Sequence, residues 1–440
     1  MLHIIRKQRI ELLLSQGEAS FSIQQKLSDQ YWEFFVPLID EILTDLSNED
    51  EVLSLDSLTI DLGNIKPLDL DHIKSNGRLV ENIKQQLEEQ ILKERALKHR
   101  VNIQHTALSD FHKWISYLRQ GYLEWNVEFP IDAWQEHVLA SLSSTMETLN
   151  HFILEVERSP NFRIRLVRQH ADSFLNRLIK VIAPKHEKIL DKKVKEFFAI
   201  ASKNKEINAG NIMVWREKFW LDLIQVVSNE FFNSDSAEFK NRIEQIKVDD
   251  HSFANPLIDQ SRSFEELKEI TEIKEAIFQD HVGLVLLHPF LNSLFKQLGL
   301  VKDKDFISLD AKEKAIYLLH FAATGKEQPK EYELTVPKLL CSYPIKAAIP
   351  TAITLSQDEK EEVIAMMEAC IANWEILKKT SVEGLREGFL QRKGKIELGM
   401  DKITIQVEKG PIDMLLDYLL WNLNLIKFPW LKQLIHIEWR

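Results

Sequence analysis

From residue 77 to residue 232, apolar residues recur at helical spacing with few interruptions. Leu79, Ile83, Leu87 and Ile91 fall on one face of a first helix. Similar single faces follow at about 108–118, 131–156, 164–182, 186–202 and 212–232. With only 13 glycines and 13 prolines in 440 residues, little breaks these patterns. Single apolar faces without sustained heptads predict a packed helical bundle rather than a long coiled coil.

The N-terminal region has a different pattern. Apolar residues at helical spacing predict a helix over 24–46, in which Pro37 introduces a kink or begins a fresh helix. Residues 52–62 then alternate as an extended chain does, with a one-residue change of phase that a β-bulge or tight bend near Asp56 and Ser57 would repair. These features predict a helix-plus-strand unit.

The C-terminal region combines helices with strands. Capping-box spacing marks three helix starts, at the pairs Ser263/Glu266, Asp310/Glu313 and Ser356/Glu359. Alternation over 396–407, with a hairpin turn at 399–401, predicts two strands, and further extended pieces follow at 423–427 and 434–439. The pattern predicts a helical module closed by a small, mostly antiparallel sheet.

The expected fold is therefore mainly α with α+β ends. At 440 residues and 51.4 kDa, the chain is too long for one ordinary core. We expect an N-terminal unit at 1–72, a helical middle domain at 73–250 and a C-terminal α+β module at 262–440. A linker is predicted at 247–261, where acidic residues and an Asn-Pro pair interrupt the helical pattern.

Composition excludes several classes of function. The net charge of −11 argues against general nucleic-acid binding. No window approaches the ~18 apolar residues of a membrane helix, and no secretory signal is visible, so synthesis in the cytoplasm without membrane insertion is expected. Cys341 and Cys370, the two cysteines, lie in apolar neighbourhoods and are interpreted as buried thiols.

Charge is unevenly distributed along the chain. Residues 40–71 hold ten acidic residues against one lysine, a net −9, whereas residues 163–205 hold twelve basic residues against four acidic ones, a net +8. Two interpretations stay open. The segments are solvated faces of unrelated elements, or they bind each other within the chain or between neighbouring copies.

No catalytic, metal or cofactor-binding motif is found. Gly325-Lys326 resembles part of a phosphate-binding loop, but Glu327 follows it and His320 stands where the first glycine belongs. Two cysteines far apart cannot form paired zinc-ligand motifs. His288, in an apolar stretch before a proline, is expected to bond a backbone group rather than act as an acid or base.

Candidate residues for binding a partner are Arg386 and three tryptophans, because arginine and aromatic side chains often anchor interfaces, and basic residues of the 163–205 segment, because their charge suits an acidic surface. The candidates are Arg386, Trp421, Trp430, Trp439, Arg163, Arg165, Arg168, Lys192 and Lys193. Arg386 has an alternative role in ion pairs within its own helix, with Glu383 or Glu387. Each tryptophan has core packing as its alternative.

Several short motifs occur together in the C-terminal region. They are GLVLLHPFL at 283–291, TGKE at 324–327, VPKLLC at 336–341, LKKTSVEGLREGFLQRKG at 377–394, PID at 411–413, LIKFPW at 425–430 and IEW at 437–439. VLSLDSLTIDLG at 52–63 follows an amphipathic helix at the other end. In this order the motifs resemble the tape-measure family of contractile injection systems, which are phage-tail-like particles.

The resemblance implies a non-enzymatic structural component of such a particle. We expect a terminal or cap adaptor on the end of the inner tube or sheath, because short helices with β ends cannot span a tube. The alternatives are a tape measure or initiation factor that sets tube length, and an assembly chaperone. The implied partners are inner tube, sheath, and cap, terminator or baseplate proteins, with several copies in a ring. The particle itself is released or acts outside the cell.

Overall fold

The structure is a computed structural model, and it describes most of the chain. It covers residues 20–46, 51–65, 77–96, 102–127, 134–203, 209–232, 236–246 and 276–439 except 56, 352, 400 and 401, together with residues 3, 5, 8–11, 13 and 14. Two compact units result, Met1–His112 and Lys113–Arg440. The boundaries predicted at 72, 250 and 262 stay predictions, and the linker predicted at 247–261 lies outside the described residues.

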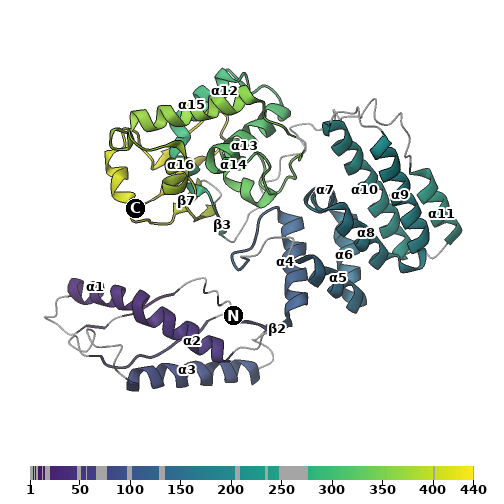
Figure 1. The fold of residues 1–440 in the computed structure, drawn as a ribbon. Helices are drawn as coiled ribbons and strands as arrows, with labels where there is room; N and C mark the ends of the chain where they lie inside the picture. Colours follow the sequence, from purple (N-terminus) through teal and green to yellow (C-terminus); the bar gives the residue numbers. More distant parts are fainter. Residues whose placement is uncertain are drawn as a thin grey trace. The chain divides into compact units, whose positions relative to one another are not determined.

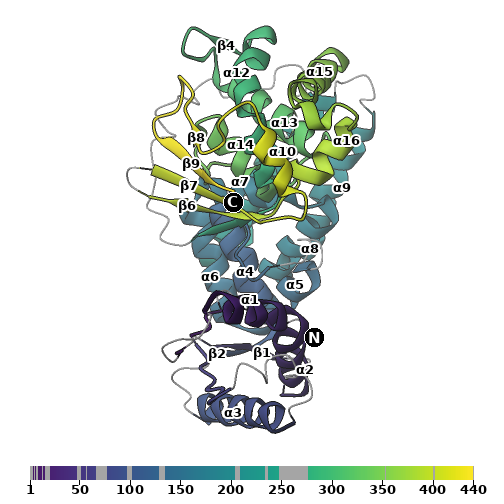
Figure 2. The same ribbon diagram turned by 90° about the vertical axis from the view of Figure 1, so that its left-hand side faces the viewer.

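The first unit contains helices and a two-stranded sheet. Its elements are α1 (Ser20–Gln30), the π-helix η1 (Tyr31–Phe35), α2 (Val36–Leu46), β1 (Glu51–Ser54), α3 (Gly77–Ala96) and β2 (Asn102–His105), and α4 (Thr106–Gln120) begins in it. Strands β1 and β2 pair antiparallel, with Glu51 opposite His105. Helix α3 lies beside α2 in two views (Figures 1 and 2).

One apolar cluster explains why α3 belongs to this unit. Four side chains of α1–α2 pack against three of α3, and the cluster consists of Ile23, Leu27, Phe35, Ile42, Leu79, Ile83 and Leu87. The face predicted for the helix starting near residue 77 is therefore buried against the N-terminal helices. The prediction at Pro37 is also met, because α2 begins at Val36 after the π-helical turn.

The extended segment after β1 follows α3 instead of joining the sheet. The Thr59 amide donates to Gln90 Oε1 at 3.1 Å, and the Asp61 amide donates to Gln86 Oε1 at 2.8 Å. Gln86 Nε2 donates in turn to the Asp61 carbonyl at 2.7 Å. Glutamine side chains thus bond the backbone groups that a neighbouring strand would otherwise bond. Residue 56, where a bulge or bend was predicted, is outside the described part of the chain.

The second unit begins as a helical bundle. Its helices are the rest of α4, then α5 (Trp134–Ser144), α6 (Met146–Arg158), α7 (Pro160–Gln169), α8 (Asp172–Ile182), η4 (Pro184–His186), α9 (Glu187–Lys203), α10 (Ala209–Phe232) and α11 (Ser236–Gln245). Helices α9, α10 and α11 lie side by side (Figure 1). Apolar faces with fully buried Trp114 and Trp220 form the bundle core.

Two predicted helices are each divided in the structure. The pattern over 131–156 breaks at Thr145, whose extended backbone and side-chain bond to the Thr148 amide cap α6. The pattern over 164–182 breaks before Asp172, because Ala171 is extended. A helical apolar period can continue across such a break, since both short helices bury the same kind of face.

The C-terminal module adds mixed helices and strands. Its helical elements are η6 (Val282–Leu287), α12 (His288–Gln297), α13 (Leu309–Thr324), η7 (Glu331–Leu334), α14 (Thr335–Leu340), α15 (Gln357–Asn373), η8 (Glu375–Leu377), α16 (Val382–Leu385), the π-helix η9 (Arg386–Leu390) and η10 (Asp413–Tyr418). Its strands are β3 (Ile277–Gln279), β4 (Val301–Lys302), β5 (Asp305–Phe306), β6 (Gly394–Leu398), β7 (Lys402–Val407), β8 (Leu425–Ile426) and β9 (Leu434–Glu438).

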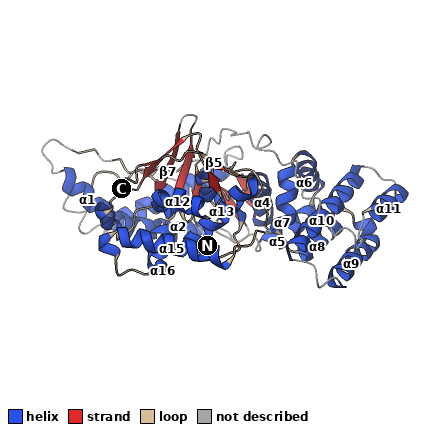
Figure 3. Cartoon of the chain, turned by 90° about the horizontal axis from the view of Figure 1, so that it is seen from above, coloured by secondary structure: helices blue, strands red, loops and turns tan. Residues whose placement is uncertain are grey.

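A five-stranded sheet closes this module. Its order is β3-β6-β7-β9-β8; β7 and β9 are parallel, and the other pairs are antiparallel. Figure 2 shows β6, β7, β9 and β8 in that order. Figure 3 shows red strands at β7 and β5, and only blue helices in the bundle α5–α11. The predicted mainly α fold with a small, mostly antiparallel C-terminal sheet is confirmed.

Helix starts in this module refine the capping predictions. Ser356 and Glu359 form the predicted capping box at α15. The box predicted at Asp310 is wrong, because Ser308 caps α13 by accepting from the Ala311 amide and Asp310 lies inside the helix. Ser263 is outside the described residues. Strand β3 was not predicted, since three residues carry too little alternation to be recognised.

Candidate docking surfaces

Helix α7 joins the helical bundle to the C-terminal module. Asn161, Arg165 and Gln169 are spaced four residues apart, so they share one face of the helix. Asn161 Oδ1 accepts from the Ala348 amide at 3.3 Å, and Gln169 Oε1 accepts from the Glu331 amide at 3.5 Å. This face therefore binds C-terminal backbone groups on both sides of Arg165.

A buried ion triad lies at the centre of this junction. Arg165 Nη2 is 3.0 Å from Glu331 Oε1, Lys338 Nζ is 2.8 Å from the same oxygen, and all three side chains are at most 1% exposed. Burial alone would raise the pKa of Glu331, but the two cations outweigh it and hold the pKa below its usual value. The triad is therefore a charged contact inside the protein.

Both cations also donate hydrogen bonds to backbone carbonyls, although Arg165 Nε is buried without a partner. Arg165 donates to the carbonyls of Leu118 and Lys346, and Lys338 donates to those of Ile345 and Ala347. The guanidinium fits because Gly121 has no side chain: a Cβ there would lie 2.8 Å from Arg165 Nη2. Gly121 also has a φ of +82°, the left-handed backbone conformation that glycine commonly adopts after the end of a helix.

The other arginines of the predicted basic segment have partners within the second unit. Arg168 forms a two-bond contact with Glu217 of α10, at 2.8 and 2.9 Å. Arg163 donates to the Val156 carbonyl at 3.0 Å and is half-buried. Both contacts stabilise the helical bundle, and partner binding at these two positions stays a prediction.

The two predicted lysines of α9 differ in exposure. Lys193 is buried and lies 3.6 Å from Glu196. Lys192 is exposed, as its neighbours one helical turn away in either direction are. Of the pair, Lys192 is the residue that an incoming partner can reach.

Arg386 is bonded within the C-terminal module. Its guanidinium donates to the Ala322 and Phe321 carbonyls at 3.0 and 3.2 Å, and to Glu383 at 3.0 Å. Gly325 (φ +72°) lies beside it, and a Cβ there would be 3.2 Å from Nη1. The ion pair with Glu383 is the alternative that the sequence left open for this residue.

The three C-terminal tryptophans pack into the module core. Trp430 is buried and donates to the Leu340 carbonyl at 2.8 Å, and Trp439 is buried directly after the last strand. Trp421 is half-buried, donates to the Leu286 carbonyl at 3.2 Å and contacts Phe290 edge-on. Trp421 is the most accessible of the three, and its role in partner binding stays a prediction.

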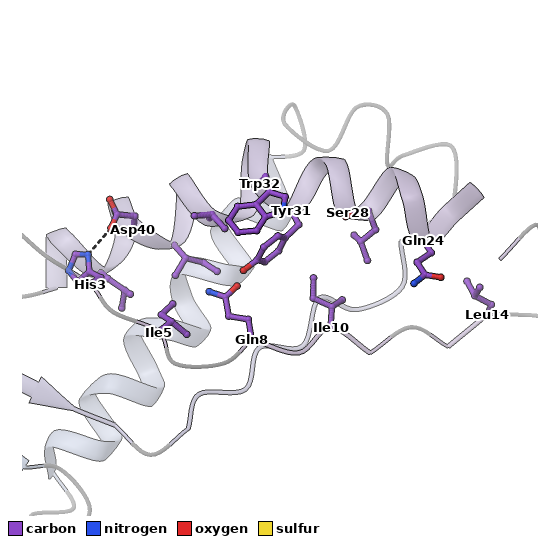
Figure 4. Close-up of a pocket in the computed structure, with 14 residues that line it drawn as sticks. His3, Ile5, Gln8, Ile10, Leu14, Gln24, Ser28, Tyr31, Trp32 and Asp40 are labelled. Carbon is purple, nitrogen blue, oxygen red and sulfur yellow. Dashed lines mark hydrogen bonds and ion pairs between the residues drawn. The ribbon is translucent and has the colours of Figure 1, made fainter. Parts of the chain in front are cut away.

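The first unit contains a groove that the sequence did not indicate. It has a volume of about 840 Å³ and lies between the segment holding Ile5, Ile10 and Leu14 and the helix holding Tyr31 and Trp32 (Figure 4). A bond of 2.9 Å between the side chains of His3 and Asp40 closes one end of the groove. The rest of the lining is mostly apolar, with the hydroxyls of Ser28 and Tyr31 and the amides of two glutamines.

Ionisable groups in the C-terminal core are held neutral or bonded. His288 Nδ1 lies 3.1 Å from the Val285 carbonyl, and burial lowers its pKa. The expected backbone contact of His288 is therefore present.

Among the described residues, no cluster of histidine, cysteine, aspartate or glutamate could hold a metal ion. No helix among them is both long and apolar enough to cross a membrane.

Both cysteines are expected to be unreactive in the folded protein. Cys341 and Cys370 are fully buried, and burial raises the pKa of Cys370 to about 12. We predict negligible labelling by an aromatic disulfide reagent in native buffer and labelling of both thiols in denaturant. A Ser202→Cys variant, at an exposed position of α9, should label at once in native buffer. Rapid native labelling of either natural cysteine would contradict the prediction.

The predicted docking residues that the structure describes are held mainly by packing, hydrogen bonds and ion pairs within the second unit. A family model described as contractile injection system tape measure protein matches residues 2–439. The chain belongs to this family. No curated protein and no solved structure matches it.

Membership fixes the general role of the chain. It is a structural component of a contractile injection system, and such a component interacts with other subunits of the particle. A structural family implies a non-enzymatic role. The match also includes the middle helices, in which the sequence showed no recognisable motif.

Proposed function

We propose that the chain sets the length of the particle's tube during assembly, as a tape measure. The observation that carries this proposal is the family match over residues 2–439, which includes both units. A ruler that lies extended as a helix adds about 1.5 Å per residue, so a 440-residue chain would reach about 660 Å.

Changing the length of the chain tests this function. Inserting about 20 helical residues between 250 and 260 should lengthen the tube by about 30 Å, and inserting twice as many should lengthen it by about 60 Å. Tube lengths would be measured by electron microscopy of purified particles. A matched control replaces residues 250–260 by a helical sequence of the same length, so that the sequence of the segment changes and the length of the chain does not. Tubes of unchanged length in both insertion variants would contradict the ruler.

A terminal adaptor is the second candidate, and the lengths of the helices favour it. The longest helix among the described residues is α10, with 24 residues, which spans only about 36 Å. A protein folded in this way can cover the end of the inner tube or sheath and contact a cap, terminator or baseplate protein there. In this role, insertions would leave tube length unchanged.

Locating the chain in the particle separates these candidates. A label at a single point on one end would support the adaptor, whereas a label along the tube would support the ruler. A chain that is required for assembly but absent from purified particles by mass spectrometry would instead be an assembly chaperone.

A further inference from the structure

Helix α9 presents a row of lysines on one face. Lys185, in the preceding turn, and Lys188, Lys192 and Lys195 follow each other at intervals of three, four and three residues. Residues at this spacing lie above one another on a helix. All four side chains are exposed. We call these four residues the lysine stripe.

The acidic residues of α9 form their ion pairs with lysines outside this stripe, and Asp191 also feels the charge of a stripe member, Lys195. Lys180 of α8 lies 2.7 Å from Asp191 and 3.4 Å from Glu187, and Lys193 lies 3.6 Å from Glu196. Within the described part of the chain, no ion pair joins a carboxylate to the lysine stripe. The positive charge of the stripe is therefore available to a partner.

The first unit has a helix face of the opposite charge. Asp29, Glu41 and Asp45 are exposed on α1 and α2, whereas Phe35 and Ile42 are buried against α3. Asp40, their neighbour, is bonded to His3 and is left out of this set. No ion pair among the described residues involves these three carboxylates, which we call the acidic face.

We propose that the lysine stripe of one copy binds the acidic face of a second copy of this chain. The two surfaces have opposite charge and comparable length, because ten helical residues separate Lys185 from Lys195 (about 15 Å) and sixteen separate Asp29 from Asp45 (about 24 Å). Opposite charges on facing helices set register and speed association.

This contact uses different surfaces on the two copies. A contact of this kind repeats from copy to copy and closes into a ring or grows as a filament. The inference goes beyond the proposed function because it names a second copy as a partner and holds for a ruler, an adaptor or an initiation factor. Exposed charges are screened by salt, so association should weaken as ionic strength rises.

Reciprocal charge reversal tests the contact in the full-length protein. Lys188→Glu/Lys192→Glu should weaken self-association about tenfold in low salt, measured by sedimentation velocity, and Glu41→Lys/Asp45→Lys should do the same. Mixing the two variants should restore association, because each then offers a complementary face to the other. A contact inside a single chain would not be restored by mixing.

The control reverses two exposed lysines elsewhere with the same change in net charge. Lys296→Glu/Lys409→Glu in the C-terminal module should leave self-association unchanged. The proposal is overturned if the wild-type chain stays monomeric in low salt, or if the mixture associates no better than either variant alone. Binding of the wild type to vesicles of anionic lipid, lost in Lys188→Glu/Lys192→Glu while self-association persists, would assign the stripe to a membrane surface and also overturn it.

Discussion

Replacing Glu331 by glutamine is expected to destabilise the second unit by about 3–5 kcal/mol. The substitution keeps the shape of the side chain but leaves the buried cations of Arg165 and Lys338 without their shared anion. Removing one partner from a buried ion pair leaves an uncompensated charge, which costs more than the pair contributes. Urea unfolding followed by tryptophan fluorescence would measure the change.

An exposed ion pair provides the matched control for Glu331. Glu327→Gln removes the partner of Lys360, but Glu327 is 48% exposed, so a loss below about 1 kcal/mol is expected. Equal effects of the two substitutions would contradict a buried, charged triad. Arg165→Met/Glu331→Leu/Lys338→Met should lose less than the sum of the three single changes, since no charge is left unpaired.

The triad also predicts an acid dependence. The pKa of Glu331 is lower in the folded protein than its ordinary value of 4.5 in the unfolded chain. Its stabilising contribution is therefore present above that ordinary value and is lost as the pH falls through the folded pKa. As the pH is lowered, the free energy of unfolding should fall less steeply in Glu331→Gln than in the wild type. Identical slopes in the two proteins would show that the pKa of the Glu331 carboxyl does not change on folding.

The sequence predicted the elements of this fold better than their junctions. The apolar period locates helices because it reflects burial of one face, as at Leu79, Ile83 and Leu87. It could not locate the break at Thr145, because the same period continues on both sides of it. The alternation of apolar and polar residues likewise predicted strands β6 and β7. These strands pair at five positions, and Ile396 lies opposite Ile405.

Side-chain partners were beyond the reach of sequence patterns. Arg165 and Glu331 are 166 residues apart, and no local rule pairs residues at that distance. Arginine and tryptophan were chosen as docking residues from their frequency in interfaces, yet the same chemistry suits buried sites. Arg386 and Trp430 show this, because both donate to backbone carbonyls inside the module. Residue type alone does not distinguish an arginine or tryptophan that binds a partner from one that is buried inside the protein.

Replacing Gly283 by alanine is expected to destabilise the C-terminal module by at least about 3 kcal/mol, at or beyond the upper end of overpacking effects. A Cβ at Gly283 would lie 1.8 Å from the Phe389 carbonyl oxygen and 3.1 Å from Leu390 Cα. These are backbone atoms of the π-helix η9, so no side-chain rotation can relieve the clash. The Val282 amide, which donates to the Arg392 carbonyl at 2.9 Å, holds the two segments together.

The same substitution at an open position separates this clash from the general effect of losing a glycine. Gly77→Ala, at the first residue of α3, meets no atom within 4 Å and should change stability by about 0.5 kcal/mol or less. Both variants would be compared by urea unfolding and by hydrogen exchange at η6 and η9. If hydrogen exchange at η6 and η9 were unchanged in Gly283→Ala, the backbones of Gly283 and Phe389 would have to lie further apart than in the structure.

The close approach of Gly283 to Phe389 also gives a physical reason for two of the segments that resemble the family. Gly283 is the first residue of the GLVLLHPFL motif, and Phe389 lies in the LKKTSVEGLREGFLQRKG motif.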